Sequence, residues 1–219
     1  MKYFDQLWYD CALDKIKQLK KDGEKFVVFD VGAGDSVLEL PVRALQGEWI
    51  GFDYKPRKAG IIKLDLEQPL PPDLIDKKPD IILHLEVIEH VFNAGRAMAN
   101  LSAMARPGTY MILTTPNPFW SLNRLKFLFL NQFPNFEPGD TEAHHHVFTV
   151  WPHVLKKLLA NNEFTLLEEF TLGSAARFPS LKSVIRNPFR IPVYLLRKLL
   201  ERINPESRGM SYGVVVIRR

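Results

Sequence analysis

The sequence predicts an α/β fold, built as a mostly parallel sheet with helices on both of its faces. Short apolar runs typical of buried strands recur along the chain, and stretches with helical spacing separate several of them. The first three runs each end at or beside an acidic residue. The chain of 219 residues is long enough to bury the core of one such domain.

The order of the elements follows from these runs. Seven strands are predicted, at 25–31, 49–53, 60–65, 80–85, 110–115, 164–171 and 212–217. A first helix is predicted over 3–21, because Phe4, Trp8 and Cys11 follow helical spacing and Gly23 would end it. Two more helices are predicted over 87–105 and 152–161. We expect a single domain over 1–219, with insertions at 119–140 and 175–211.

The composition limits the class of protein. With 46% hydrophobic and 25% charged residues, the chain is typical of a globular protein rather than a disordered one. No apolar run approaches the ~18 residues of a membrane-spanning helix, and the N-terminus lacks the pattern of a signal peptide. The single Cys11 excludes an internal disulfide and has the spacing of a core position. We therefore expect a cytoplasmic protein.

Positive charge is concentrated near the C-terminus. Residues 174–208 include eight Lys or Arg and two acids, so this segment carries +6 in a chain of net charge +4. The nearly neutral remainder does not indicate nucleic-acid binding across the surface. Residues 192–203 place leucines on one stripe of a helix that Pro192 would begin. We expect this stripe to pack on the sheet, and peripheral contact with an anionic membrane is the alternative.

The stretch FVVFDVGAGDSVLEL, residues 26–40, carries the first functional signal. Gly32 and Gly34 follow a predicted strand, where they allow the backbone to approach a ligand closely. A dinucleotide fingerprint would need a third glycine where Val37 stands, and the chain has no P-loop motif. A pyrophosphate cradle is therefore poorly supported.

Residues 30–36 resemble motif I (D/E-x-G-x-G-x-G) of class I S-adenosylmethionine (SAM)-dependent methyltransferases, with Ser36 in place of the third glycine. Further stretches resemble this family in the same order. Asp53 ends the second strand 23 residues after Asp30. The others are IIKLDLEQPLP, HLEVIEHV, ARPGTYMILTTPNP and HHHVFTVWPHVLKKLLANNEF. The resemblance covers about residues 24–173 and the last strand.

The resemblance implies a Rossmann-like methyltransferase fold, in which the last of seven strands is antiparallel. It implies SAM as the cofactor and S-adenosylhomocysteine as its product. Asp53 would bind the ribose, where a charged acceptor strengthens hydrogen bonds to a diol. Asp65 would bind the adenine amino group, beside a backbone contact from Leu66. The cofactor-binding residues implied are Asp30, Gly32, Gly34, Asp53, Asp65 and Leu66. Glu86 is expected to contact the cofactor or the substrate, because a buried acid at the rim of the fourth strand would be costly unless it were used.

Histidines are the candidates for acid–base chemistry. Glu89 could orient His90 or raise its pKa as a general base, although Glu89 is also a typical first-turn acid of a helix. The run 144–146 offers His144 as a second candidate base and His146 as a substrate contact. Asn117, beyond the fifth strand, is a further substrate contact. We expect no metal, because no third ligand with a fixed spacing is evident.

The sequence therefore predicts a SAM-dependent methyltransferase that acts on an oxygen or nitrogen atom of a small molecule. The two insertions would form the acceptor pocket, and their aromatic and basic character suggests an anionic or lipid-linked acceptor. The alternative is a non-catalytic protein of the same fold that binds a partner or a membrane through 175–211. A dehydrogenase is a third hypothesis. The main evidence against it is Val37, which stands where a dinucleotide fingerprint needs a glycine.

Overall fold

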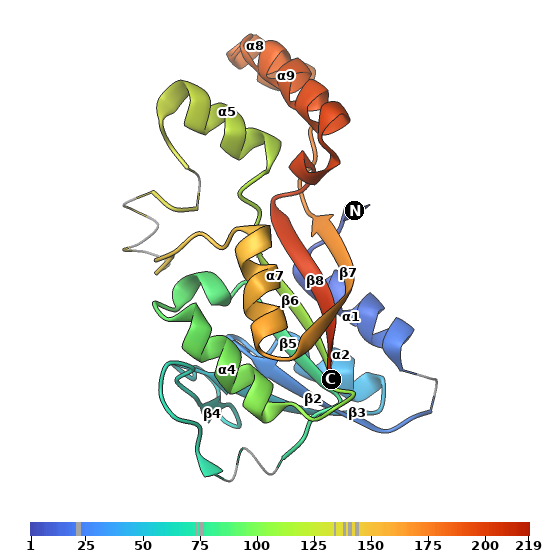
Figure 1. Ribbon diagram of the computed structural model, residues 1–219. Coiled ribbons are helices and arrows are strands. Elements are labelled where there is room, and N and C mark those ends of the chain that lie inside the picture. The colour runs from blue at the N-terminus through green and yellow to red at the C-terminus, as the bar shows by residue number, and fades with distance from the viewer. Residues whose placement is uncertain are drawn as a thin grey trace.

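The computed structural model describes residues 1–20, 23–72, 74, 77–133, 135–137, 139, 142 and 145–219. Its centre is a sheet of eight strands in the order β1-β7-β8-β6-β5-β2-β3-β4 (Figure 1). The strands are β1 (Lys2–Phe4), β2 (Phe26–Val31), β3 (Gly47–Asp53), β4 (Ile62–Lys63), β5 (Ile81–Leu85), β6 (Tyr110–Pro116), β7 (Phe164–Leu172) and β8 (Ser211–Arg218).

The pairing of the strands confirms the predicted fold class. Only β8 runs antiparallel to its neighbours β6 and β7, while the other described pairs are parallel. The seven predicted strands correspond to β2 through β8, although β4 is only two residues long. The carboxyl ends of β2, β3, β4 and β5 therefore meet at one edge of the sheet.

The strand β1 is additional to the seven predicted strands, and it corrects the prediction for the N-terminus. The helix predicted over 3–21 begins only at Trp8, as α1 (Trp8–Leu19). The first residues instead pair with β7, and the Tyr3 hydroxyl donates a hydrogen bond of 2.6 Å to the carbonyl of Gly173. Residues 2–4 thus form a strand and not a helix, despite the helical spacing of Phe4. Pairing with β7 satisfies backbone groups that an open edge strand would leave exposed.

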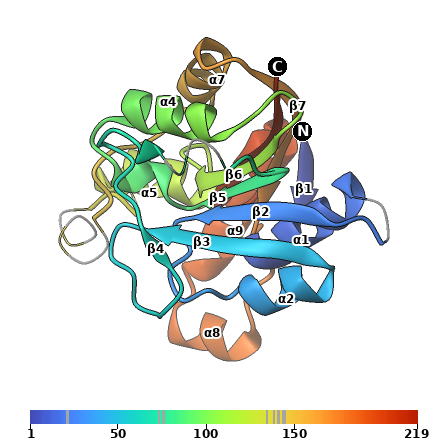
Figure 2. The same cartoon turned by 90° about the horizontal axis from the view of Figure 1, so that it is seen from below.

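Helices cover both faces of the sheet (Figure 2). On one face, α1 and α2 (Glu39–Ala44) enclose a core that includes Ile16, Val28 and Val42. On the other, α4 (Ala94–Met104) and α7 (Pro152–Asn161) cover Phe29 and Phe52. Cys11 lies in the first of these cores, as predicted, with 1% of its surface exposed.

The helix predicted over 87–105 is divided in two. A 3-10 turn, η1 (Ile88–His90), comes first, and α4 begins only after Asn93. The Asn93 side chain accepts a hydrogen bond of 2.9 Å from the backbone N–H of Arg96, so it caps the helix. The turn matters for function, because it carries the candidate base His90.

The two insertions form helices beyond the carboxyl end of β7 (Figure 1). They are α5 (Ser121–Leu130) from the first insertion, and α8 (Leu181–Arg186), α9 (Arg190–Ile203) and the turn η2 (Pro205–Ser207) from the second. The prediction that the leucine stripe of α9 packs on the sheet is wrong. The helix contacts α5 and α8, and Leu195, Leu199 and Ile203 are 54% to 72% exposed. No helix in the described part of the chain is long and apolar enough to cross a membrane.

Candidate active site

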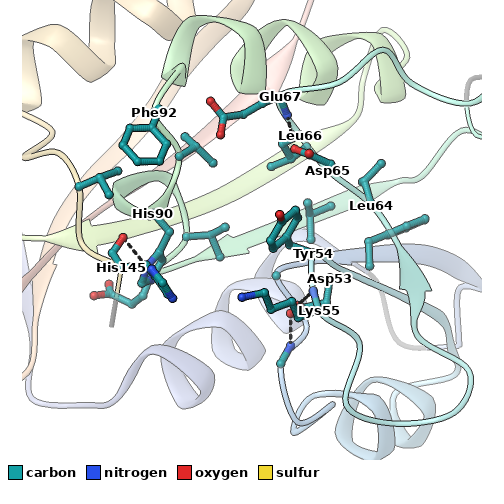
Figure 3. A pocket seen from close by; sticks show the side chains of 18 of the residues that line it. Asp53, Tyr54, Lys55, Leu64, Asp65, Leu66, Glu67, His90, Phe92 and His145 are labelled. Atoms are coloured by element: carbon teal, nitrogen blue, oxygen red, sulfur yellow. Dashed lines mark hydrogen bonds between the residues drawn. The ribbon is translucent and has the colours of Figure 1, made fainter. Parts of the chain in front are cut away.

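A pocket of about 550 Å³ lies at the carboxyl ends of β2, β3, β4 and β5 (Figure 3). Ligands bind in this position in open α/β sheets. Seven of the residues singled out in the sequence line it together: Gly32, Gly34, Asp53, Asp65, Leu66, Glu86 and His90. Parallel strands bring these separate stretches of sequence to a single cavity.

The glycines after β2 shape one wall of the pocket. The backbone N–H groups of Gly32 and Ala33 both donate to the carbonyl of Phe52, at 2.8 and 2.9 Å, which turns the chain sharply. Gly32 has φ +98°, and a Cβ atom there would lie 2.2 Å from Cγ2 of Val87. Only glycine fits this turn without moving its neighbour.

Asp53, at the end of β3, is held with its carboxylate at the pocket wall. It accepts hydrogen bonds from the backbone N–H of Gly34, at 2.9 Å, and of Lys55, at 2.8 Å. Each bond engages a different carboxylate oxygen, so the group is oriented before any ligand arrives. Each oxygen keeps a lone pair for a further donor, as two vicinal hydroxyls would require.

Asp65 and Leu66 follow β4 on the far side of the pocket from His90 (Figure 3). The Asp65 carboxylate accepts a hydrogen bond of 2.9 Å from the backbone N–H of Glu67. The carbonyl of Leu66 accepts one of 2.8 Å from the side-chain amide of Asn100. Both residues are thereby fixed in place where they line the cavity.

Glu86 follows β5 in a left-handed conformation, with φ +54°. Its backbone N–H donates to the carbonyl of Thr114 at 2.9 Å. The side-chain Oε1 is buried without a hydrogen-bond partner among the described residues. Burial raises the pKa of Glu86 to about 7, against the opposing effect of the side chains of Thr114, Ser211 and Trp8. An unpartnered acceptor in a pocket is a site for a cationic or hydrogen-donating ligand group.

Glu89 lies behind the pocket and is fully buried. It accepts a hydrogen bond of 3.0 Å from the Thr115 hydroxyl, and its backbone carbonyl accepts one of 3.0 Å from Val147. Burial, with the nearby charge of Glu86, raises the pKa of Glu89 well above its usual range. Glu89 thus joins β6, the turn η1 and the segment that begins at His145.

His90 lines the pocket and contacts this same segment. Its Nδ1 lies 3.3 Å from the carbonyl of His145, and a hydrogen bond there places the hydrogen on Nδ1, because a carbonyl oxygen only accepts. The ring packs edge-on against His146, with centroids 4.8 Å apart. One ligand atom each of Glu89, His90 and His146 lies within 4.8 Å of the others, close enough to hold a metal ion.

The remaining predicted residues lie elsewhere. Asp30 is 5% exposed behind the pocket wall, where it accepts a hydrogen bond of 3.1 Å from the Trp49 indole. Asn117 is 1% exposed, and its amide donates to the carbonyls of Glu206 and Gly209 at 2.9 and 3.0 Å. Neither residue lines the pocket.

The other two predicted histidines, His144 and His146, belong to the run 144–146. His146 does not line the pocket, and its Nδ1 bonds to the carbonyl of Asn135. His144 lies outside the described residues. Its role as a second candidate base therefore stays a prediction.

Several lining residues were missed by the sequence reasoning. Tyr54, Lys55 and Arg57 follow Asp53 directly, and Phe92 and His145 flank the candidate histidines. Proximity to Asp53 was a usable signal for the first three. Neither insertion contributes a lining residue within the described ranges, so the expectation that they form the acceptor pocket is not met by this cavity.

Sequence comparison shows that the chain is similar to known methyltransferases. The profile of the family described as "Methyltransferase domain" matches residues 3–169. A ubiquinone biosynthesis O-methyltransferase of Rhodopseudomonas palustris (strain BisB18) is 29% identical over 154 residues, which cover 65% of this chain and 59% of that protein.

Solved structures show the same fold. A SAM-dependent methyltransferase from Archaeoglobus fulgidus has a TM-score of 0.59 at 17% identity, covering 96% of this chain and 94% of that one. A SAM-dependent methyltransferase from Thermotoga maritima, a possible histamine N-methyltransferase, has a TM-score of 0.60 at 16% identity, covering 96% and 89%.

The sheet order and the pocket at its carboxyl edge define a Rossmann-like protein of the class I methyltransferase type. The family match is more specific, and the chain belongs to the SAM-dependent methyltransferase-domain family. The chain spans 59% and 63% of the length of two of the curated relatives that it matches.

Proposed function

We propose that this protein transfers a methyl group from SAM to an oxygen or nitrogen atom of a small-molecule acceptor. The observation that carries the proposal is the acidic wall of the pocket. Asp53, Asp65 and Glu86 follow three different strands and line one cavity beside the glycine turn. A ligand with a ribose diol, an amino-bearing base and a positive charge matches these three acceptors.

The residues present fit SAM. Asp53 offers two oriented oxygens for a ribose diol, and Glu86 offers a buried acceptor to a cationic group. The left-handed turn at Gly32 brings backbone close to the cavity without a Cβ atom. SAM, when bound, supplies a methyl group already attached to a good leaving group, so the protein's main task is alignment.

The chain's own residues would complete the reaction. In the proposed reaction, Nε2 of His90 accepts the proton that a hydroxyl or amine acceptor loses, while the carbonyl of His145 fixes the ring through Nδ1. Val91, Phe92 and Val147 line the pocket near the same histidine and would exclude water from the reacting atoms. Lys55 and Arg57 add positive charge at the wall, which suits an acidic acceptor.

For the acceptor we propose a phenolic hydroxyl, either free or on a lipid-linked precursor. The support is the name of the relatives, ubiquinone biosynthesis O-methyltransferases. The exposed aromatic residues of the pocket, Tyr54 and Phe92, are suited to contact a ring.

The test is transfer of a labelled methyl group from SAM to a panel of phenols, catechols and amines, with and without a prenyl tail. We expect a methylated phenol and an equal amount of S-adenosylhomocysteine. SAM binding without turnover on any member of the panel would instead favour the non-catalytic alternative.

A further inference from the structure

The helix α9 turns one ion pair, Arg197 and Glu201, toward the protein. Glu201 is 3% exposed and accepts hydrogen bonds from the Ser121 hydroxyl, at 2.7 Å, and from the backbone N–H of Ala176, at 2.9 Å. Arg197 donates to the same Ser121 oxygen at 2.9 Å and lies over the ring of Trp120. These contacts anchor α9 to the start of α5.

The opposite side of α9 is apolar and faces solvent. The leucines at 195, 196 and 199 and Ile203 recur at spacings of three and four residues, so they share one face. Because Arg197 and Glu201 are held against the protein, the apolar face on the other side of the helix points to solvent. The neighbouring α8 adds two more exposed side chains, Leu181 and Ile185, one helical turn apart. The six apolar residues are 41% to 76% exposed, and we call them the α8–α9 face.

The exposed charges on the helices α8 and α9 all have one sign. The stretch 174–203 is described throughout and has a single acid, Glu201, which is buried against Arg197. The exposed charges on α8 and α9 are Lys182, Arg186, Arg190, Lys198 and Arg202. An apolar stripe flanked by cations matches the boundary between anionic headgroups and acyl chains.

We propose that the α8–α9 face docks this protein on the surface of an anionic lipid bilayer. The helix α9, with 14 residues, is about 21 Å long at 1.5 Å per residue, shorter than the ~30 Å hydrocarbon core. It therefore lies along the interface, with Leu195, Leu196 and Leu199 inserted and Lys198 and Arg202 at the headgroups. The cations repel a second copy placed on the same face by a two-fold axis, and a nucleic acid would leave the leucines unused.

The proposed docking face lies at the same edge of the sheet as the pocket. The insertions lie beyond the carboxyl end of β7, and β7 points the same way as the strands that carry the pocket (Figure 1). The pocket and the α8–α9 face are thus at the same edge of the sheet. A docked protein would hold that edge toward the bilayer. The proposal stands independently of methyl transfer, because it uses no pocket residue.

The test is co-sedimentation of the full chain with vesicles of phosphatidylcholine and phosphatidylglycerol, against vesicles of phosphatidylcholine alone. Two double variants remove one feature each: Leu195→Gln with Leu199→Gln, and Lys198→Glu with Arg202→Glu. Leu40→Gln is the matched control, since Leu40 is 77% exposed on α2, which lies far from α8 and α9 (Figure 1). Thermal unfolding of each variant shows that it folds as the wild type does.

We expect the wild type and Leu40→Gln to bind the anionic vesicles alike and to be released by salt. Both double variants should bind at least tenfold more weakly. Equal binding to both vesicle types, or no binding by the wild type, would overturn the proposal. So would unchanged binding by either double variant, or a wild-type dimer that the Leu195→Gln and Leu199→Gln changes dissociate, because a second copy would then cover the face.

Discussion

At the scale of single residues, the two pocket glycines are constrained differently. Gly32 has both a positive φ and a neighbour, Val87, in the place of a Cβ atom, whereas Gly34 has a positive φ and open space. We expect Gly32→Ala to lower the free energy of unfolding by about 1 to 3 kcal/mol, and Gly34→Ala by less. Urea unfolding of both variants measures the difference.

A second change provides the control for the Gly32 prediction. Val87→Ala removes the Cγ2 atom that a Cβ at Gly32 would meet. The double variant should therefore lose less stability than the two single losses together predict. Strict additivity would show that the backbone angle, and not the close contact, makes glycine necessary.

Glu86 should make stability depend on pH. Its ordinary pKa is 4.5 and burial raises its pKa to about 7 in the folded protein. Between these values the folded state binds more protons than the unfolded state, so its contribution to stability falls as pH rises and then stays constant above 7. Relative to Glu86→Gln, the wild type should lose stability from about pH 4.5 to 7. Urea unfolding across this range checks the prediction, and parallel curves for the two proteins would refute it.

His90 should affect the chemical step more than cofactor binding. If Nε2 of His90 accepts the acceptor's proton, His90→Gln should lower kcat by roughly 100-fold or more while SAM affinity changes little. Rapid-quench measurement of methyl transfer on the acceptor found by the screen separates these effects. A variant with full kcat would leave His90 as a lining residue only.

At the scale of elements, the buried contact between α5 and α9 should hold both insertions together. Glu201→Ala leaves Arg197 partly buried and without its carboxylate, which lies 3.6 Å away. We expect a loss of about 3 kcal/mol, confined to α5, α8 and α9. Hydrogen exchange measured by segment should show faster exchange there, with no change in β2, β3 or β5. Uniform loss of protection would mean that these helices unfold only with the sheet.

The elements also show where prediction from sequence succeeds. The apolar runs that became β2, β3, β5, β6, β7 and β8 are long enough to be unambiguous. The spacing of Phe4 predicts a helix where the three-residue β1 lies, because the pairing of β1 with β7 is remote in sequence. For α9 the spacing identified which residues share a face. It could not show that the buried pair Arg197 and Glu201 turns that face outward.

At the scale of the whole molecule, the sheet explains most of the candidate site. Parallel strands place every residue that follows a strand at one edge, so Asp53, Asp65 and Glu86 could be grouped from sequence. Asp30 and Asn117 lie close to strand ends as well, yet their side chains point to structural partners, Trp49 and the loop 206–209. The direction of a side chain at a strand end depends on tertiary contacts that one sequence does not display.

Binding of SAM in this pocket is tested most directly by calorimetry. S-adenosylhomocysteine should be titrated into the wild type, Asp53→Ala and the exposed-surface control Leu40→Gln. We predict micromolar binding to the wild type and the control, and binding at least roughly tenfold weaker (~1.4 kcal/mol) to Asp53→Ala. A folded wild type that binds neither S-adenosylhomocysteine nor SAM would contradict the account.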